Sequence, residues 1–87
     1  MPQLLIGTKF SVSAARLPAA MQRKLAESLS VLAQNPYDSR LHTKALSGNL
    51  DGIFSFRLSR DWRVLFAFQT FHCIQLLRVK HRKDIYR

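Results

Sequence analysis

The last ten residues of the printed sequence, RVKHRKDIYR (residues 78–87), combine a dense set of cations with a tyrosine. Five of the ten are Lys or Arg, and His81 and Tyr86 add two side chains that can transfer protons. Guanidinium and ammonium groups bind phosphate, so one interpretation is part of a site that acts on a phosphate backbone. The alternative is a solvated basic tail, for which the neighbouring Ile85 and Tyr86 are an unusual apolar pair.

Cleavage of RNA is a reaction that such residues can carry out without a metal. The 2′-hydroxyl of the substrate is the nucleophile, so the protein has to remove its proton, stabilise negative charge on phosphorus and protonate the departing 5′-oxygen. Arginines serve the second task, and a lysine, histidine or tyrosine serves the first or the third. Because DNA has no 2′-hydroxyl, contacts to this group also make the reaction specific for RNA.

Other kinds of site find little support in the sequence. His42, His72, His81 and Cys73 have no recognised metal-ligand spacing, and the five acidic residues form no cluster. There is no glycine-rich phosphate loop and no Ser-His-Asp arrangement. We therefore expect neither a metal nor a small-molecule cofactor. His42 is most simply a surface histidine, with a contact to RNA as the alternative.

The charge of the chain indicates a polyanionic partner. Fourteen Lys and Arg against five Asp and Glu give a formal net charge of +9 and a pI near 10.9. The excess of arginine over lysine favours bidentate phosphate contacts, and such a basic protein also calls for an acidic protein partner. The single Cys73 fits a reducing compartment. No membrane span or signal peptide is evident, so we expect a cytoplasmic protein.

The first half of the chain predicts one strand followed by helices. Leu4–Phe10 is short, apolar and partly β-branched, which is typical of a strand. Ser11 or Ser13 is a potential cap for a short helix at residues 14–17. From Pro18 to residue 34, apolar residues recur with helical spacing, and Asn35-Pro36 ends that helix. The polar residues 37–52 predict a long irregular connection.

The second half changes to a period of two. Phe54–Leu58 and Trp62–Phe68 alternate between large apolar and polar or smaller residues, and predict a hairpin with a turn at residues 59–61. A third strand follows at Cys73–Val79. The whole chain, residues 1–87, therefore predicts a single α+β domain. Its N-terminal strand and one or two helices pack on one face of a largely antiparallel four-stranded sheet.

The hairpin predicts a basic surface opposite its aromatic face. If that aromatic face packs on the helices, Arg57 and Arg63 lie together on the other face, and cross-strand neighbours are only about 5 Å apart. Depending on register, the third strand adds Arg78 and Lys80 to this face, or His81 and Arg82 reach it from the segment beyond. The alternative is that Arg57 and Arg63 are ordinary solvent-facing residues of an uncovered sheet.

Four segments together resemble one known family over essentially the whole chain: LHTKALSG (residues 41–48), FSFRL (54–58), DWRVLF (61–66) and VKHRKDIYR (79–87). They resemble the RelE/ParE superfamily of toxins from type II toxin–antitoxin systems. The resemblance implies a small basic toxin that enters the ribosomal A site and cuts mRNA there. It also implies a cognate acidic antitoxin that binds and neutralises the toxin.

The resemblance implies a role for individual residues. Arg63 in the Asp-Trp-Arg motif and Arg57 on the preceding strand correspond to groups that stabilise the phosphate. Arg82 resembles the C-terminal basic group that assists the leaving group or positions the substrate. Tyr86 resembles the catalytic tyrosine, with Lys80 or His81 as alternative groups for proton abstraction. The candidate RNA-binding residues are Lys44, Arg60, Arg78, Lys83 and Arg87.

One departure from the family pattern leaves the general base open. Nuclease members often carry two lysines on the first hairpin strand, where this chain has Ser55 and Arg57, and arginine stays protonated. A ParE-like inhibitor of DNA gyrase, with the same fold and no nuclease activity, is therefore the alternative function. A basic nucleic-acid-binding module without activity is a third class, which explains the charge but not Tyr86. For the antitoxin, we expect an acidic segment that folds on binding.

Overall fold

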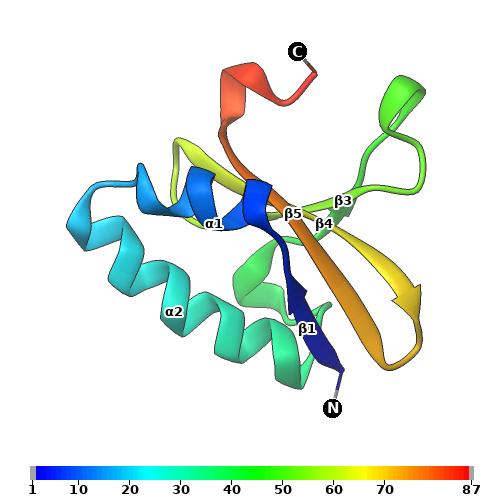
Figure 1. Ribbon diagram of the computed structural model, residues 1–87. Coiled ribbons are helices and arrows are strands. Elements are labelled where there is room, and N and C mark those ends of the chain that lie inside the picture. The colour runs from blue at the N-terminus through cyan, green and yellow to red at the C-terminus, as the bar shows by residue number, and fades with distance from the viewer. Residues whose placement is uncertain (1, 87) are drawn as a thin grey trace.

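The structure is a computed structural model in which residues 2–86 are described. The helices and strands are, in chain order, β1 (Gln3–Ile6), α1 (Thr8–Ala15), α2 (Ala19–Gln34), β2 (Lys44–Ala45), β3 (Phe54–Arg57), β4 (Trp62–Thr70) and β5 (Cys73–His81). Short 3₁₀ turns are η1 (Ser39–Leu41), η2 (Gly48–Leu50) and η3 (Arg82–Asp84). Figure 1 shows α1 crossing in front of β5 and the longer α2 beside it.

The strands form one five-stranded sheet in the order β1-β5-β4-β3-β2, in which only the β1–β5 pair is parallel. The predicted α+β class, with helices packed on one face of a largely antiparallel sheet, is confirmed. The predicted number of four strands is wrong. Lys44 and Ala45, within the expected irregular connection, pair with Ser55 and Phe54 as β2. Two residues are too few to produce a period-two pattern in a sequence.

The first helix begins earlier than its serines suggested. The strand expected at Leu4–Phe10 ends at Ile6, and α1 begins at Thr8 rather than near residue 14. Gly7 precedes the helix in an extended conformation without a side-chain capping bond. Phe10 therefore lies on a helix, where it is buried in the main core.

The second helix matches its predicted boundaries. Pro18 lies at its N-cap, and Asn35 leaves the helix in an extended conformation before Pro36, as the restriction on residues before proline requires. Leu25 and Leu32 are its buried residues. Among the described residues, no helix has the length and apolar character needed to cross a membrane.

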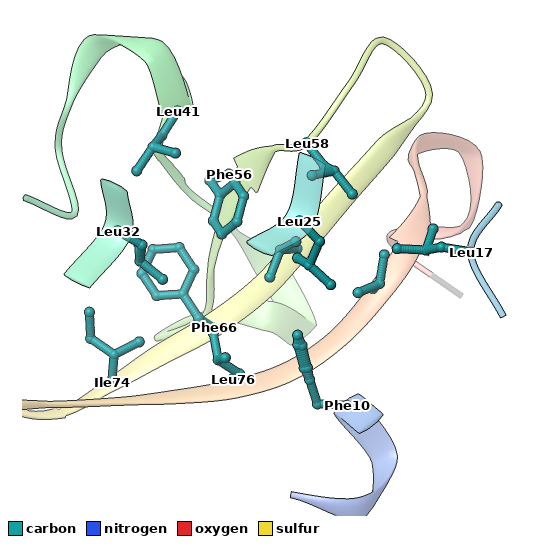
Figure 2. Close-up of a cluster of buried hydrophobic side chains, with 12 residues drawn as sticks. Phe10, Leu17, Leu25, Leu32, Leu41, Phe56, Leu58, Phe66, Ile74 and Leu76 are labelled. Atoms are coloured by element: carbon teal, nitrogen blue, oxygen red, sulfur yellow. The ribbon is translucent and has the colours of Figure 1, made fainter. Parts of the chain in front are cut away.

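The aromatic face of the hairpin packs against the helices, as predicted. Phe56 and Phe66 of the sheet are completely buried in one cluster with Leu32 of α2 and Phe10 of α1 (Figure 2). Fully burying one such side chain contributes about 1.5–3 kcal/mol. This core fixes which face of β3 and β4 is turned away from the helices.

A smaller apolar cluster lies on that opposite face. It consists of Leu46, Leu65 and Ile85, all buried. Leu65 alternates along β4 with Val64 and Phe66 of the main core, so it points to the other side of the sheet. The cluster joins the connection after β2 and the segment after η3 to the sheet.

Strand β5 contains a bulge that decides which of its side chains face the helices. Phe66 pairs with Leu76, but the preceding Leu65 pairs with Arg78, which leaves Leu77 as an extra residue. Ile74 and Leu76 lie in the main core before the bulge, and Val79 lies there after it. An unbroken strand would have kept residues 74, 76, 78 and 80 on one face. The bulge instead allows Val79 to be buried and pairs Lys80 with Arg63.

Ser13 connects α1 to β5 just beyond this bulge. Its hydroxyl accepts a hydrogen bond from the backbone N–H of Val79 at 2.9 Å and donates to the carbonyl of Phe10 at 3.0 Å. A buried backbone N–H that lacks a partner is costly, so this side-chain link helps to hold the end of β5 against the helix.

Candidate functional site

Three cations form a row across the sheet face opposite the helices. Arg57 of β3 pairs directly with Arg63 of β4, and Arg63 pairs on its other side with Lys80 of β5. Directly opposite residues project from the same face, with Cβ atoms about 4.5–5.5 Å apart in antiparallel pairs. Like charges at this spacing repel one another. The row is therefore a position at which a bound anion lowers the energy.

Arg63 is held in place by the turn that precedes it. Its Nη1 donates to the carbonyl oxygens of Ser59 at 2.7 Å, Arg60 at 3.1 Å and Trp62 at 3.1 Å. These bonds anchor one terminal nitrogen of the guanidinium. The remaining N–H groups of the fork are suited to paired hydrogen bonds with phosphate oxygens.

Burial and two neighbouring cations both act on the charge of Arg63. Burial lowers the pKa of its guanidinium, the charges of Arg57 and Arg82 lower this pKa further, and Asp61 acts in the opposite direction. An arginine remains protonated at physiological pH despite such a shift. The lowered pKa therefore reflects burial first, and the repulsion from Arg57 and Arg82, which a bound phosphate would relieve, second.

Arg82 is connected to the same turn through Asp61. The backbone N–H of Arg82 donates to the carbonyl of Asp61 at 2.7 Å, and its Nε lies 3.7 Å from the Asp61 carboxylate. Both side chains of this ion pair are about half exposed. Pairs of this kind contribute about 0–1 kcal/mol to stability, so the link mainly positions η3 beside the hairpin turn.

These arginines line one groove, here called the C-terminal groove, with a volume of about 240 Å³. It contains no carboxylate among its lining residues. They are His42, Lys44, Leu46, Ser55, Arg57, Arg63, Arg82, Ile85 and Tyr86. The groove thus brings together four of the six predicted catalytic residues, Arg57, Arg63, Arg82 and Tyr86, and one predicted RNA-binding residue, Lys44.

Tyr86 reaches this groove because its neighbour is anchored. Ile85 is buried against Leu46 and Leu65, whereas Tyr86 is 62% exposed. An anchored residue directly before an exposed one holds the phenol at the groove without burying it. The apolar pair Ile85-Tyr86 is therefore not part of a free tail.

The other two predicted catalytic residues lie outside the groove. Lys80 belongs to the cationic row, but its Nζ donates to the carbonyl of Asp84 at 3.4 Å. His81 pairs with Trp62, and the two rings meet edge-on with centroids 5.3 Å apart. Since Trp62 packs on the main core and Arg63 follows it, His81 lies on the face away from Arg63. The backbone N–H of Lys83 donates to Nδ1 of His81 at 3.3 Å.

The remaining predicted RNA-binding residues are dispersed. Arg60 is exposed and lines a second groove on the helix side of the hairpin turn. Arg78 lies beside α1, where it lines a shallow groove with Lys9 and Arg16. Lys83 is exposed on η3 and lines neither the C-terminal groove nor the second one. Arg87 lies outside the described residues.

Sequence patterns did not predict that Lys24 and Arg40 lie near the site, and they favoured a surface role for His42 over its alternative, a contact to RNA. His42 lines both grooves and is the only described residue other than glycine with a positive φ, at 50°. This conformation is uncommon for such residues and is frequent at functional sites. His42 follows η1 in a polar segment without periodicity, so the sequence pattern could not decide between a surface histidine and a contact to RNA. Within residues 2–86, no three His, Cys, Asp or Glu side chains lie close enough to hold a metal ion.

The comparisons with known proteins give matches among solved structures. No profile of a known protein family matches the chain, and no curated protein sequence does. A chain of the RelBE2 toxin–antitoxin complex from Mycobacterium tuberculosis is 26% identical, with 93% of this chain and 98% of that chain covered and a TM-score of 0.77.

Two further structures extend this likeness. A chain of the archaeal RelE–RelB complex from Pyrococcus horikoshii is 24% identical over 93% of this chain and 94% of that chain, with a TM-score of 0.76. YafQ from Escherichia coli is 16% identical over 100% of both chains, also with a TM-score of 0.76. The protein therefore has the fold of the RelE/ParE superfamily of toxins, which confirms the resemblance that its sequence motifs carry.

Proposed function

We propose that the protein is the toxin of a type II toxin–antitoxin system and that it cleaves mRNA in the ribosomal A site. The observation that carries the nuclease half is the C-terminal groove, in which Tyr86 lies with Arg57, Arg63 and Arg82 and no carboxylate is among the lining residues. The toxin half is supported by the shared fold, which occurs in toxin–antitoxin complexes.

In the proposed reaction, the 2′-hydroxyl oxygen attacks the adjacent phosphorus and the bond from phosphorus to the 5′-oxygen breaks. The products are a 2′,3′-cyclic phosphate and a free 5′-hydroxyl. Negative charge grows on the non-bridging phosphate oxygens in the transition state, where Arg63 and Arg57 donate hydrogen bonds. The three carbonyl contacts of Arg63 hold its guanidinium before the substrate arrives, so little reorganisation is needed.

Tyr86 is the proposed proton-transfer group. Its hydroxyl can both accept and donate a proton, and it lies in the same groove as the two phosphate-binding arginines. His81 and Lys80 are less suited to this role, because one is turned toward Trp62 and the other contacts Asp84. Arg82 is proposed to position the substrate at the side of the leaving 5′-oxygen. Lys44 is proposed to bind a phosphate at the rim.

The proposed partners follow from charge and exposure. A net charge of +9 and an open groove of cations suit an acidic antitoxin segment that folds on binding and covers the groove. The same groove suits mRNA presented in the ribosomal A site. The proposed reaction therefore takes place in the cytoplasm, where translation supplies the substrate.

The proposal is tested by inducing the protein in cells and mapping mRNA 5′ ends along translated reading frames. Wild type is compared with Arg63→Ala and Tyr86→Phe. Arg16→Ala serves as the matched control, because it removes the same charge as Arg63→Ala beside α1, outside the C-terminal groove. We expect cuts in phase with codons in wild type and control, and their loss in the two site variants.

A different result would reassign the protein. Growth arrest with intact mRNA and double-strand DNA breaks would overturn the nuclease and place the protein with gyrase-inhibiting toxins. Equal loss of cuts in Arg63→Ala and Arg16→Ala would show that total charge matters and the groove does not.

A further inference from the structure

A larger groove adjoins the C-terminal groove. This helix groove has a volume of about 530 Å³ and lies between α2, the residues after Asp38 and the hairpin turn. Its lining residues are Lys24, Glu27, Ser28, Val31, Arg40, Leu41, His42, Arg57, Leu58, Ser59, Arg60, Arg63 and Arg82. Because His42, Arg57, Arg63 and Arg82 line both grooves, the two grooves adjoin along these residues.

The helical period of α2 supplies one wall of the helix groove. Lys24, Glu27 and Val31 recur at spacings of three and four, so they lie along one stripe of the helix. Leu25 and Leu32, displaced around the helix, are buried in the main core. The packing of this core therefore fixes the direction in which the Lys24 stripe faces.

The helix groove adds cations beyond the proposed cleavage site. Lys24, Arg40 and Arg60 lie along it, and Glu27 is the only acid among its lining residues. Arg40 is already paired with Asp38, at 2.9 Å between Nε and the carboxylate. Lys24 and Arg60 form no ion pair within the described part of the chain. These two are the cations most available to an outside anion.

We propose that the helix groove binds the single-stranded RNA chain on one side of the cleaved phosphate, with Lys24 and Arg60 on its flanking phosphates. The inference rests on the proposed function, because the phosphate held by Arg57 and Arg63 marks where the chain leaves the C-terminal groove. RNA is a continuous polyanion, so a chain bound at that point continues into an adjoining groove where cations recur. Backbone contacts of this kind position RNA and carry little sequence preference.

The test measures binding of RNA that cannot be cleaved, because the reacting nucleotide lacks its 2′-hydroxyl. A trinucleotide centred on this nucleotide is compared with RNAs extended separately on the 5′ and the 3′ side, by fluorescence anisotropy over a range of salt concentrations. The double variant Lys24→Ala/Arg60→Ala removes the proposed contacts. Lys9→Ala/Arg16→Ala removes the same charge beside α1, away from both grooves.

We expect the RNA extended on one of the two sides to bind wild type and the control variant more tightly than the trinucleotide does. In Lys24→Ala/Arg60→Ala, the same extension should no longer tighten binding. Each phosphate contact contributes about 0.7 to the salt slope for single strands, so loss of two contacts lowers the slope by about 1.4. Glu27→Gln removes the one acid of the groove and should tighten binding of the extended RNA without affecting the trinucleotide.

Equal weakening in the two double variants, or no gain from extension on either side, would overturn the proposal. So would weaker binding of extended RNA by Glu27→Gln. If the proposed nuclease function fails while the inference on RNA binding holds, the result differs from both of these outcomes. In that case extended RNA still binds through Lys24 and Arg60, while ribosome-bound mRNA stays intact.

Discussion

Arg57 and Arg63 lie directly opposite each other on β3 and β4, and neither forms an ion pair within residues 2–86. Like charges in this position destabilise an antiparallel pair by about 0.2–1 kcal/mol. Sites that must bind a charged substrate commonly sacrifice some stability in this way. The pair therefore connects the stability of the sheet to the proposed chemistry of the groove.

Replacing Arg57 should separate these two effects. Arg57→Thr removes the repulsion and keeps a residue that favours strands, so we expect the free energy of unfolding to rise by about 0.5 kcal/mol at low salt. Loss of one donor to the transition state should lower mRNA cleavage by about 10²-fold. Urea unfolding and cleavage on programmed ribosomes measure the two quantities. Unchanged cleavage would mean that Arg57 is an ordinary solvent-facing residue.

Even a conservative replacement of Arg63 should lower the rate of mRNA cleavage. Arg63→Lys keeps the charge, but an ammonium cannot reproduce a planar fork anchored on the carbonyls of Ser59, Arg60 and Trp62. We expect cleavage by this variant to fall about 10²-fold, close to the value for Arg63→Ala. Single-turnover rates at saturating ribosome concentration provide the comparison. Recovery of most activity with lysine would show that a point charge is sufficient and that the fork is not used.

Tyr86 and His81 should differ sharply in their effect on cleavage. Tyr86→Phe removes the proposed proton-transfer hydroxyl and should slow the cleavage step by about 10²–10⁴-fold. His81→Asn keeps an acceptor for the N–H of Lys83 and should leave the rate within several-fold of wild type. The reverse ranking in single-turnover assays would assign the proton transfer to His81.

Acid should loosen the segment that carries His42. Side-chain and backbone hydrogen bonds from Arg40 lower the pKa of Asp38 from 3.8 to about 2. A lowered carboxyl pKa stabilises the folded state above the ordinary value of 3.8, and this contribution is lost as pH falls from there to about 2. An NMR titration should give a midpoint for Asp38 near 2 in wild type and nearer 3.8 in Arg40→Gln. The amide signal of His42 should shift over the same range. Identical midpoints in the two proteins would contradict this coupling.

Periodicity in the sequence was sufficient to predict α2 and the hairpin, but not α1, whose Phe10 also lies in the core. The spacing of Leu25 and Leu32 gave α2, and the alternation through Phe56 and Phe66 gave the hairpin and its buried face. Once that face was known, the position of Arg57 and Arg63 on the other side followed from the two-residue period. These signals are strong because burial of apolar residues dominates the energetics of such a small domain.

The third strand could not be placed from alternation alone. Its register depends on the bulge at Leu77, which turns Val79 inward and sets Lys80, rather than His81, beside Arg63. The interval of three between the buried Leu76 and Val79 is the only trace of this bulge in the sequence. Two register alternatives therefore remained until the strand pairing was known.

Periodicity could not place His42 and Arg40 at the helix groove either. These residues follow a helix end in a polar segment, and the hydrogen bonds of Asp38 that shape the turn leave no periodic pattern. Similarly, Lys24 looked like one of several solvent-facing cations on α2. Only the packing of α2 against the sheet brings it to the same depression as Arg60.

The proposed nuclease is tested most directly by cleavage of an mRNA with a single 2′-deoxynucleotide at the expected cut in the A-site codon of purified ribosomes. Wild-type protein should cut the all-ribose mRNA to a 2′,3′-cyclic phosphate and a 5′-hydroxyl, and should leave the 2′-deoxy mRNA intact although it still binds. Cleavage of the 2′-deoxy mRNA at the same bond, or no cleavage of either mRNA, would contradict a nuclease that uses the RNA 2′-hydroxyl.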